Sequence, residues 1–269
     1  MAILDGSLKF TGKLGNISFY KMSGTDKIIM RAGNGPSKKK IMNDPHFART
    51  RENIREFGAC SACSGRFRTE IRKVIPGRNI PCHNQLIVAL KQVLKSNSSG
   101  ERGKRAFLFS EHANRLVGIE LVPNQPLYDA LSVTPTIEIS ENEGSIAFAL
   151  RGFNARSHLK NRNTFRYFRF IAIVLEMPDF SYIENRKTYS YAGDEEPLAS
   201  NAYSEWFSYG DKNQEISLQV QISAMTTPSI VEKGKLMMFG VEFGVMAGGE
   251  ILCAEKTFRG KIVAAGPGI

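Results

Sequence analysis

Cysteine and histidine side chains at Cys60, Cys63, Cys82, His83 and His46 are the groups in this sequence best suited to bind a metal ion. Cys60 and Cys63 form a C-x-x-C pair, and structural zinc sites usually combine two such pairs of ligands. The second C-x-x-C pair is missing. Both cysteines also fall on the apolar side of a predicted helix, where a thiol packs as a small hydrophobic group. We therefore predict that they pack in a core, with a zinc site or a redox pair as alternatives.

Catalytic motifs are weak in this chain. Its four histidines are His46, His83, His112 and His158, and none lies in a recognisable nucleophile, base or metal motif. The sequence SEHAN around His112 joins Ser, Glu and His, but adjacent residues of a strand point to opposite faces. The acidic residues 194–196 lack the alternating spacing of a cation loop. We expect no catalytic residues, no cofactor and no metal, and hence no enzyme activity.

The charge of the chain is divided unevenly along its length. Residues 1–105 carry 21 Lys and Arg against 7 Asp and Glu, a net charge of +14, whereas residues 106–269 carry 15 against 19, a net charge of −4. A basic first part can bind a polyanion. It can equally bind the acidic part of another copy of the chain, which favours head-to-tail association.

Basic and aromatic residues support nucleic-acid binding as the alternative function. The runs SKKK and RGKR are basic, and TFRYFRF alternates arginine with aromatic residues, as base-stacking surfaces do. The last run continues into IAIVLEM, which is typical of a core strand. Since no helix-turn-helix, RNA-recognition or zinc-finger signature is present, we expect only weak, salt-sensitive contact with nucleic acid.

Short antiparallel strands are predicted at the start of the chain. NISFYKM and KIIMRA are separated by the turn sequence SGTD, and we assign residues 1–35 to an N-terminal β-hairpin that acts as an assembly arm. Ile17, Phe19, Ile28 and Met30 alternate along its strands and would form one apolar face. Because a lone hairpin is marginally stable in water, this face must dock on another surface.

A basic helical segment follows at residues 43–97. Asn43 or Asp44 is a suitable N-cap and Pro45 suits the first helical position, while Pro76-Gly77 ends the helix. A second helix is predicted at about residues 84–95, and SNSSGERGKR is predicted to be a polar linker at a domain boundary.

From residue 105 to residue 265 the apolar residues recur with a period of two. Segments such as RAFLFS, RLVGIELV, SIAFALRGF and KLMMFGVEFGVM predict nine or ten strands without intervening helices. The expected fold class is α+β, mainly β: a hairpin and two helices followed by an antiparallel, jelly-roll-like β-sandwich. No secretory signal and no membrane span are recognisable, so a cytoplasmic protein, or a component of a released particle, is expected.

The N-terminal part of the chain resembles a known group of sequences. The order GKLGNISFYKMSGTDKIIMRAG, a linker, and then NDPHFARTRENIREFG resembles uncharacterised bacterial proteins with a glycine-bounded hairpin and an N-D-P-x-F-x-R-T-R-E-N helix. It is more loosely similar to the N-terminal module of phage and phage-tail-like structural proteins, although the glutamine of their helix motif is missing here. The resemblance covers about residues 6–75 and implies a structural, self-assembling role.

These observations together predict a non-enzymatic building block of a homo-oligomeric filament, tube or phage-like particle. Its partners would be copies of itself, and residues 1–35 would cross to a neighbouring subunit. In that arrangement arginines would pair with acidic surface of the neighbour and set the register. The predicted interface residues are Ile17, Phe19, Ile28, Met30, Arg49, Arg51 and Arg55.

Overall fold

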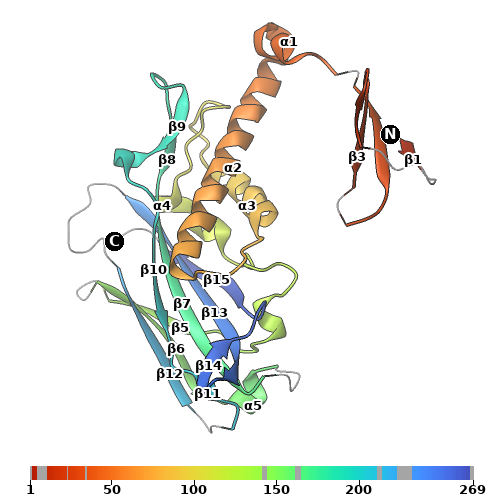
Figure 1. Ribbon diagram of the computed structural model, residues 1–269. Helices are drawn as coiled ribbons and strands as arrows, with labels where there is room; N and C mark the ends of the chain where they lie inside the picture. The colour runs from red at the N-terminus through yellow and green to blue at the C-terminus, as the bar shows by residue number, and fades with distance from the viewer. Residues whose placement is uncertain are drawn as a thin grey trace. The chain divides into compact units, whose positions relative to one another are not determined.

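The computed structural model describes residues 2–4, 11–22, 24–33, 35–140, 144–160, 165–210, 214–222 and 232–266. The chain divides into two compact units, residues 1–51 and 52–269, both drawn in Figure 1. The division falls within the long helix α2 (Ala48–Val74).

The first unit is built on a four-stranded antiparallel sheet. Its strands, in the order β1–β4–β3–β2, are Ala2–Leu4, Ile28–Ala32, Ile17–Lys21 and Gly12–Leu14. The predicted β3–β4 hairpin is confirmed, and Phe19 lies opposite Met30. Since Ile17 and Ile28 are two residues along their strands from this pair, the four predicted side chains share one face. The outer strands were not predicted, because three residues are too few to show an alternation.

A short helix occupies the segment that the sequence predicts to be a linker. The hydroxyl of Ser37 accepts a hydrogen bond from the Lys40 amide at 3.2 Å and caps α1 (Lys38–Asn43). The prediction of a linker without helix between the hairpin and residue 43 is therefore wrong, because Ser37 can cap a helix. The carboxylate of Asp44 accepts one from the His46 amide at 2.9 Å and caps the 3-10 turn η1 (Pro45–Phe47), which leads into α2. The predicted capping role of Asp44 is therefore confirmed.

The second unit combines helices and antiparallel strands. Besides α2, its helices and helical turns are α3 (His83–Ser96), α4 (Phe109–His112), η2 (Ala113–Leu116), η3 (Leu127–Asp129), α5 (Ala155–His158) and η4 (Ala192–Asp194). Its strands are β5 (Thr136–Ser140), β6 (Ser145–Phe153), β7 (Tyr167–Pro178), β8 (Phe180–Ile183), β9 (Thr188–Tyr191), β10 (Leu198–Tyr203), β11 (Phe207–Ser208), β12 (Gln214–Gln221), β13 (Lys233–Ala247), β14 (Glu250–Cys253) and β15 (Arg259–Gly266).

Two sheets form the body of this unit. The larger sheet has β7 and β13 at its centre, with β10 and β11 beside β7, and β14 and β15 beside β13. The smaller sheet has the order β12–β6–β5, and β8 and β9 form a separate hairpin. All of the described pairings in these sheets are antiparallel.

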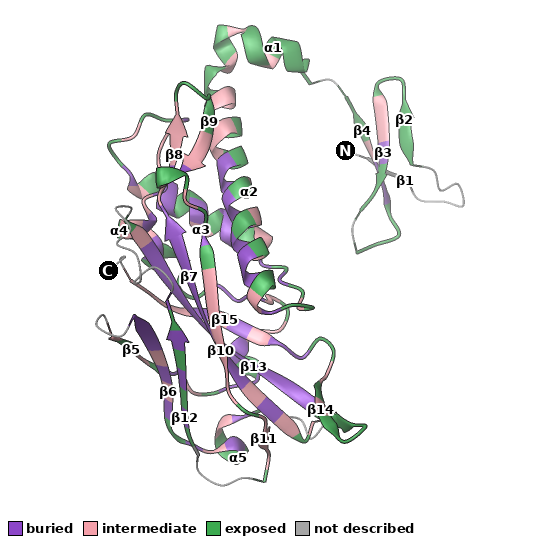
Figure 2. Ribbon diagram, turned by 60° about the vertical axis from the view of Figure 1, so that its left-hand side comes forward, coloured by how far each residue is buried: buried purple, intermediate pink, exposed green. Residues whose placement is uncertain are grey.

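The larger sheet is buried on both faces. Ile171, Ile173 and Leu175 belong to a core shared with α2 and α3, whereas Phe170 and Val174 belong to a core shared with the smaller sheet. Figures 1 and 2 show β7 and β13 between these layers. This double burial explains the apolar run of residues 170–175 within β7, because both faces of that stretch need apolar side chains. The predicted α+β, mainly β, sandwich-like fold is confirmed, with a helical layer added to the sandwich.

Two strands predicted between residues 105 and 122 are wrong. Phe107 forms only an isolated bridge with Phe180, and α4 and η2 follow it. Phe107 and Phe109 are both fully buried. An irregular segment that crosses a core can therefore show apolar residues two apart without forming a strand.

Candidate functional site

The predicted apolar interface of the first unit is partly covered within the chain itself. Phe19 and Ile28 are only 8% and 5% exposed, and Ile17 and Met30 are half-buried. Leu14, which lies opposite Ile17 on the edge strand β2, is 71% exposed. The exposed apolar surface thus lies closer to the edge of the sheet than the sequence predicts. Its signal in the sequence was a leucine between two turn-forming glycines.

The predicted interface arginines have different surroundings. Arg51 Nη1 donates hydrogen bonds to the carbonyl oxygens of Ile41 and Asp44, both at 2.8 Å, and so satisfies backbone groups near the end of α1. Arg55 lies 5.0 Å from the ring centroid of Tyr182, and Arg49 is exposed. Arg51 and Arg55 therefore have binding partners inside the chain, and their role between subunits remains a prediction.

The basic run RGKR is neutralised by carboxylates of the second unit. Its segment, predicted as a linker, packs as a loop against α2, where the Gly103 amide donates to Glu56 Oε1 at 2.8 Å. Three ion pairs hold the side chains of this loop: Arg102–Glu52 at 3.4 Å, Arg105–Glu56 at 3.7 Å and Lys104–Glu184 at 2.6 Å. This pairing lowers the positive charge that the run can offer to a polyanion.

Cys60 and Cys63 pack in the core, as predicted, and Cys82 belongs to the same core. Cys60, Cys63 and Cys82 are fully buried in the core between the helices and the larger sheet. Burial raises the pKa of Cys60 and of Cys63 to about 12 and that of Cys82 to about 11. The thiols therefore stay protonated, whereas a metal ligand or nucleophile must be a thiolate. Across the described ranges, no three His, Cys, Asp or Glu side chains are grouped as metal ligands.

A serine and a histidine that the sequence did not connect lie together at the helix pair. Ser64 Oγ of α2 is 2.9 Å from His83 Nδ1 of α3. Ser64 is fully buried, so no substrate can reach its hydroxyl. We interpret this bond as a link between the two helices, because a buried hydroxyl needs a hydrogen-bond partner.

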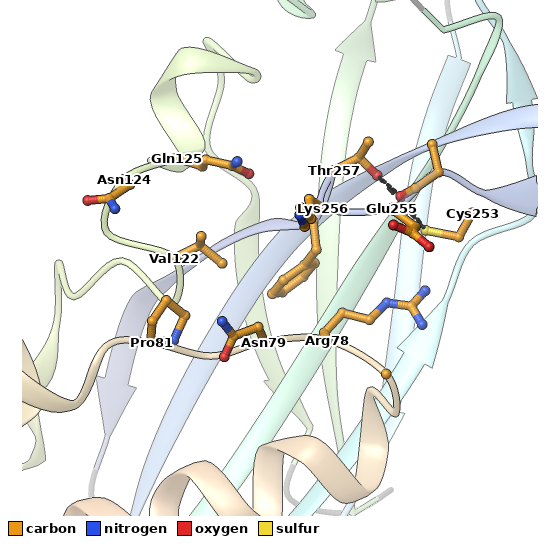
Figure 3. A pocket seen from close by; sticks show the side chains of 13 residues that line it. Arg78, Asn79, Pro81, Val122, Asn124, Gln125, Cys253, Glu255, Lys256 and Thr257 are labelled. Carbon is orange, nitrogen blue, oxygen red and sulfur yellow. Dashed lines mark hydrogen bonds between the residues drawn. The ribbon is translucent and has the colours of Figure 1, made fainter. Parts of the chain in front are cut away.

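A cavity of about 540 Å³ lies beside the C-terminal end of α2. Figure 3 shows its walls, which come from the loop after α2 (residues 77–81), the segment 122–125 and the connection between β14 and β15 (residues 253–258). Polar residues from all three segments line it. Those that the structure exposes or half-exposes are Arg78, Asn79, Asn124, Gln125, Glu255 and Lys256.

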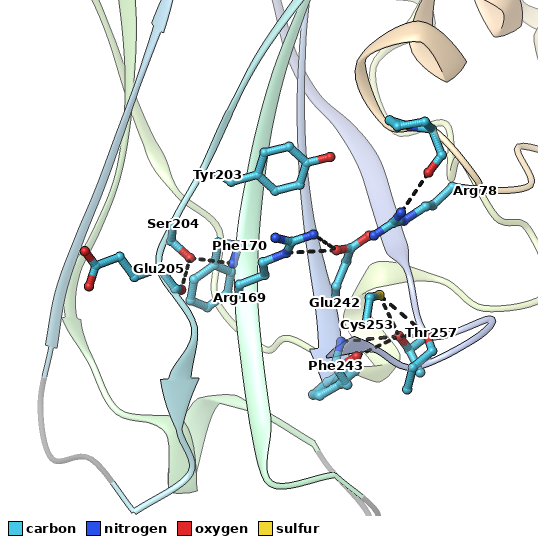
Figure 4. Close-up of polar contacts among 12 residues, drawn as sticks. Arg78, Arg169, Phe170, Tyr203, Ser204, Glu205, Glu242, Phe243, Cys253 and Thr257 are labelled. Carbon is cyan, nitrogen blue, oxygen red and sulfur yellow. Dashed lines mark hydrogen bonds and ion pairs between the residues drawn. The ribbon is translucent and has the colours of Figure 1, made fainter. Parts of the chain in front are cut away.

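An ion-pair triad around a buried carboxylate lies beside this cavity. Glu242 is fully buried; its Oε1 is 2.5 Å from Arg78 Nε and its Oε2 is 2.9 Å from Arg169 Nη2. The guanidinium carbon of Arg169 also lies 4.4 Å from the ring centroid of Tyr203 and 4.6 Å from that of Trp206. Figure 4 shows Glu242 between the two guanidinium groups. Two arginines thus compensate the cost of burying the charged carboxylate of Glu242.

The elements explain why these three charges meet. Glu242 on β13 lies directly opposite Arg169 on β7, on the face of the sheet that carries the helices. The helix α2 ends just before Pro76-Gly77, and Gly77 has a φ of 77°, which turns the chain so that Arg78 approaches Glu242. The sequence signal was a charged residue inside each of two apolar strands. This signal alone does not identify the ion pairs, because the partners lie far apart along the chain.

The cavity offers binding groups rather than a nucleophile. Burial, and then the nearby Glu242 carboxylate, raises the pKa of Cys253, so this thiol stays protonated. Thr257 Oγ1 is 2.8 Å from the Ala254 carbonyl oxygen and 3.3 Å from the Phe243 amide, so its hydroxyl is used inside the fold. The arrangement can hold a polar ligand through guanidinium, ammonium and amide groups.

The structure does not bring all of the predicted residues to one place. The four apolar residues of the sheet share a face, the arginines lie on α2, and the cavity contains none of the predicted interface residues. In comparisons with known proteins, no protein-family model, no curated protein and no solved structure matches the chain.

Proposed function

We propose that this chain is a non-enzymatic structural subunit that assembles with copies of itself through its first unit. The observation that carries the proposal is the edge of the four-stranded sheet. Within the described part of the chain, β1 and β2 each pair with a neighbour on one side only. The edge strand β2 also presents Leu14, which is 71% exposed.

An unpaired edge strand with an apolar side chain favours the addition of another strand. Backbone N–H and C=O groups at a sheet edge can pair with a second chain, and proteins use this mode to join β-structures. Because β2 has only three residues, it supplies few such hydrogen bonds. Burial of Leu14 would add about 1.5–3 kcal/mol, so this side chain should be important for the contact. Tyr20 and Met22, 45% and 49% exposed, alternate with Phe19 and so lie on the face of the sheet opposite to Leu14.

Opposite charge supports contact between copies. Residues 1–51 contain ten Lys and Arg against three Asp and Glu, a net charge of +7, while residues 106–269 carry −4. Complementary charge accelerates association and sets orientation more than it adds affinity. The proposed assembly should therefore form more slowly as the salt concentration rises.

A pair of matched substitutions tests this proposal. Leu14→Lys places a charge on the exposed edge of the first unit, whereas Ile139→Lys places one on β5, an edge strand of the second unit where Ile139 is 45% exposed. Light scattering after size-exclusion chromatography, together with negative-stain imaging, measures assembly. We expect Leu14→Lys to reduce assembly and Ile139→Lys to leave it unchanged. Equal behaviour of the two variants would argue against this edge as the interface.

Nucleic-acid binding remains a second candidate because of α1. Lys38, Lys39 and Lys40 are exposed in this helix, so their charge is accessible to a polyanion. The proposed binding is weak and indifferent to base sequence, and its affinity falls steeply with salt as counterions are released. Fluorescence anisotropy with labelled single-stranded DNA across a salt series measures it. Tight binding that persists above about 0.3 M salt would make nucleic acid the primary partner.

A further inference from the structure

We infer that the cavity beside the Arg78–Glu242–Arg169 triad binds a small organic carboxylate. This proposal concerns the second unit and is independent of assembly through the first. The ligand class follows from three features of the cavity: a fixed guanidinium group with unused hydrogen-bond capacity, an excess of positive charge, and a volume larger than a bare anion requires.

The guanidinium group of Arg78 is held in place before any ligand arrives. Its Nε donates to Glu242 Oε1 at 2.5 Å and its Nη1 donates to the Pro76 carbonyl oxygen at 2.7 Å. Among the residues that the structure describes, its Nη2 has no hydrogen-bond partner. The side chain retains 20% exposure and lines the cavity. A preorganised guanidinium donor of this kind suits a carboxylate, whose oxygen atoms accept hydrogen bonds from its N–H groups.

The buried carboxylate does not cancel the charge that Arg78 offers. Glu242 also binds Arg169 through Nε and Nη2, at 3.0 and 2.9 Å. The triad therefore keeps a net charge of +1, and only Arg78 of the three residues lines the cavity. The hydrogen bond to Glu242 also raises the pKa of Arg78, so the guanidinium stays charged.

The opposite wall adds a second cation. Lys256 is exposed in the turn between β14 and β15, where its φ is 57°. Glu255 beside it is the only acidic residue among the described groups that line the cavity. Taken with the triad, these charges leave the site at +1, which suits a monoanion better than a phosphate dianion. The amides of Asn79 and Asn124 can bind polar groups on the rest of the ligand.

The volume excludes a bare ion as the best-fitting ligand. About 540 Å³ lies within the range of small-molecule sites, about 300–1,000 Å³. Val122 and Phe258 supply apolar contact on the same walls. The ligand should therefore carry an uncharged body of the size of an amino acid or a short peptide behind its carboxylate.

Ligand-observed NMR titration of the full-length protein tests the inference. The probes are N-acetylglycine, its neutral amide N-acetylglycinamide, and acetyl-tetraalanine with a free or an amidated C-terminus. The acids are expected to bind at least about tenfold more tightly than the matched amides, because a hydrogen bond to a charged group contributes about 1.5–3 kcal/mol. Tighter binding of the free tetrapeptide than of N-acetylglycine would identify a peptide C-terminus as the source of the carboxylate. Equal affinity would identify a small molecule.

Matched lysine substitutions locate the binding. Lys256→Gln removes a cation from the cavity wall, whereas Lys187→Gln removes another exposed lysine, with a φ of 51°, from the β8–β9 turn. We expect the first to weaken binding of N-acetylglycine about three- to tenfold and the second to leave it unchanged. Both positions are exposed, so folding should be retained. Equal binding of acids and amides, no saturable binding of the acids, or equal loss in both variants would overturn the inference.

Discussion

Glu242 is the residue whose surroundings depend most on correct folding of the second unit. Its carboxylate has no access to water and is bound by two arginines that come from different parts of the chain. Replacing a buried ion-pair network with apolar residues can be harmless, but removing one member leaves the others without compensation. Loss of Glu242 would leave two guanidinium groups facing each other on the helix side of the sheet.

Glu242→Gln should therefore destabilise the protein strongly. We expect the free energy of unfolding to fall by about 3 kcal/mol, because the remaining arginines lose their common anion. The control is Glu250→Gln on the neighbouring strand β14, where the side chain is exposed, and it should change the free energy by less than about 0.5 kcal/mol. Urea denaturation followed by circular dichroism measures both. Similar midpoints for the two variants would show that the triad contributes little.

The buried thiols should make the protein less stable in alkali. In the unfolded chain a thiol ionises near its ordinary pKa of 9.0, whereas Cys60 and Cys63 keep their protons in the folded protein up to a pKa of about 12. The folded state thus binds more protons between these values, so the free energy of unfolding falls as pH rises from 9.0 toward about 12. Below 9.0 this contribution is fully present.

The Cys60→Ala, Cys63→Ala double variant checks this assignment. It should lose about 1 kcal/mol per site at neutral pH, because each substitution leaves a small cavity. Its free energy of unfolding should then decline less steeply than that of the parent above about pH 9. Urea denaturation at several alkaline pH values measures the slope. We expect assembly to persist in the variant, while stoichiometric zinc in the parent would contradict the packing role.

Among the elements, β13 is positioned by a close backbone contact that only glycine permits. A Cβ at Gly234 would overlap the Phe109 carbonyl group, with the carbonyl carbon at 2.7 Å, and would be 3.0 Å from the Ala113 Cβ. The short helices α4 and η2 thus pack directly against the start of this central strand. Gly58 within α2 has the opposite surroundings, because a Cβ there meets nothing within 4 Å.

Alanine substitutions at these two glycines should have opposite effects. Gly234→Ala is expected to lower the free energy of unfolding by roughly 1–3 kcal/mol or more, as overpacked core sites do. Gly58→Ala should raise it by about 0.5–1 kcal/mol, because alanine favours an open helical position. Thermal unfolding of both variants measures the difference in sign. Stabilisation by Gly234→Ala would show that the helices can move away from the strand.

The elements differ in how far the sequence could predict them. The long helices and strands such as β6 and β13 extend over enough residues for their apolar period to be visible. The outer strands of the first sheet are too short for this, and residues 106–122 pack their alternating apolar side chains without pairing as a strand. Only the antiparallel pairing of β7 with β13 places Arg169 opposite Glu242.

The candidate sites were predictable to different degrees for the same reason. The apolar face of the first sheet depends on local alternation, so Ile17, Phe19, Ile28 and Met30 were assigned correctly to one face. The cavity joins three segments that lie far apart in the sequence. No local pattern marks Arg78 or Lys256, and only the folded arrangement brings them to one cavity.

For the whole molecule, the main features are two compact units and a charge that changes sign along the chain. The first unit is basic and has an exposed edge strand, β2, while residues 106–269 are acidic overall. No described helix is long and apolar enough to cross a membrane. In the proposed assembly, a neighbour's surface would receive the sheet edge through backbone pairing and charge attraction.

The molar mass of the full chain, compared with that of a chain lacking residues 1–35, tests the central claim most directly. The deletion removes the strands of the first sheet and leaves the second unit intact. Light scattering should give a molar mass that is a multiple of 29.9 kDa for the full chain. The truncated chain should be a monomer, and its circular dichroism should show that the β-rich body remains folded. A monomeric full chain, or large particles that persist without residues 1–35, would contradict assembly through the first unit.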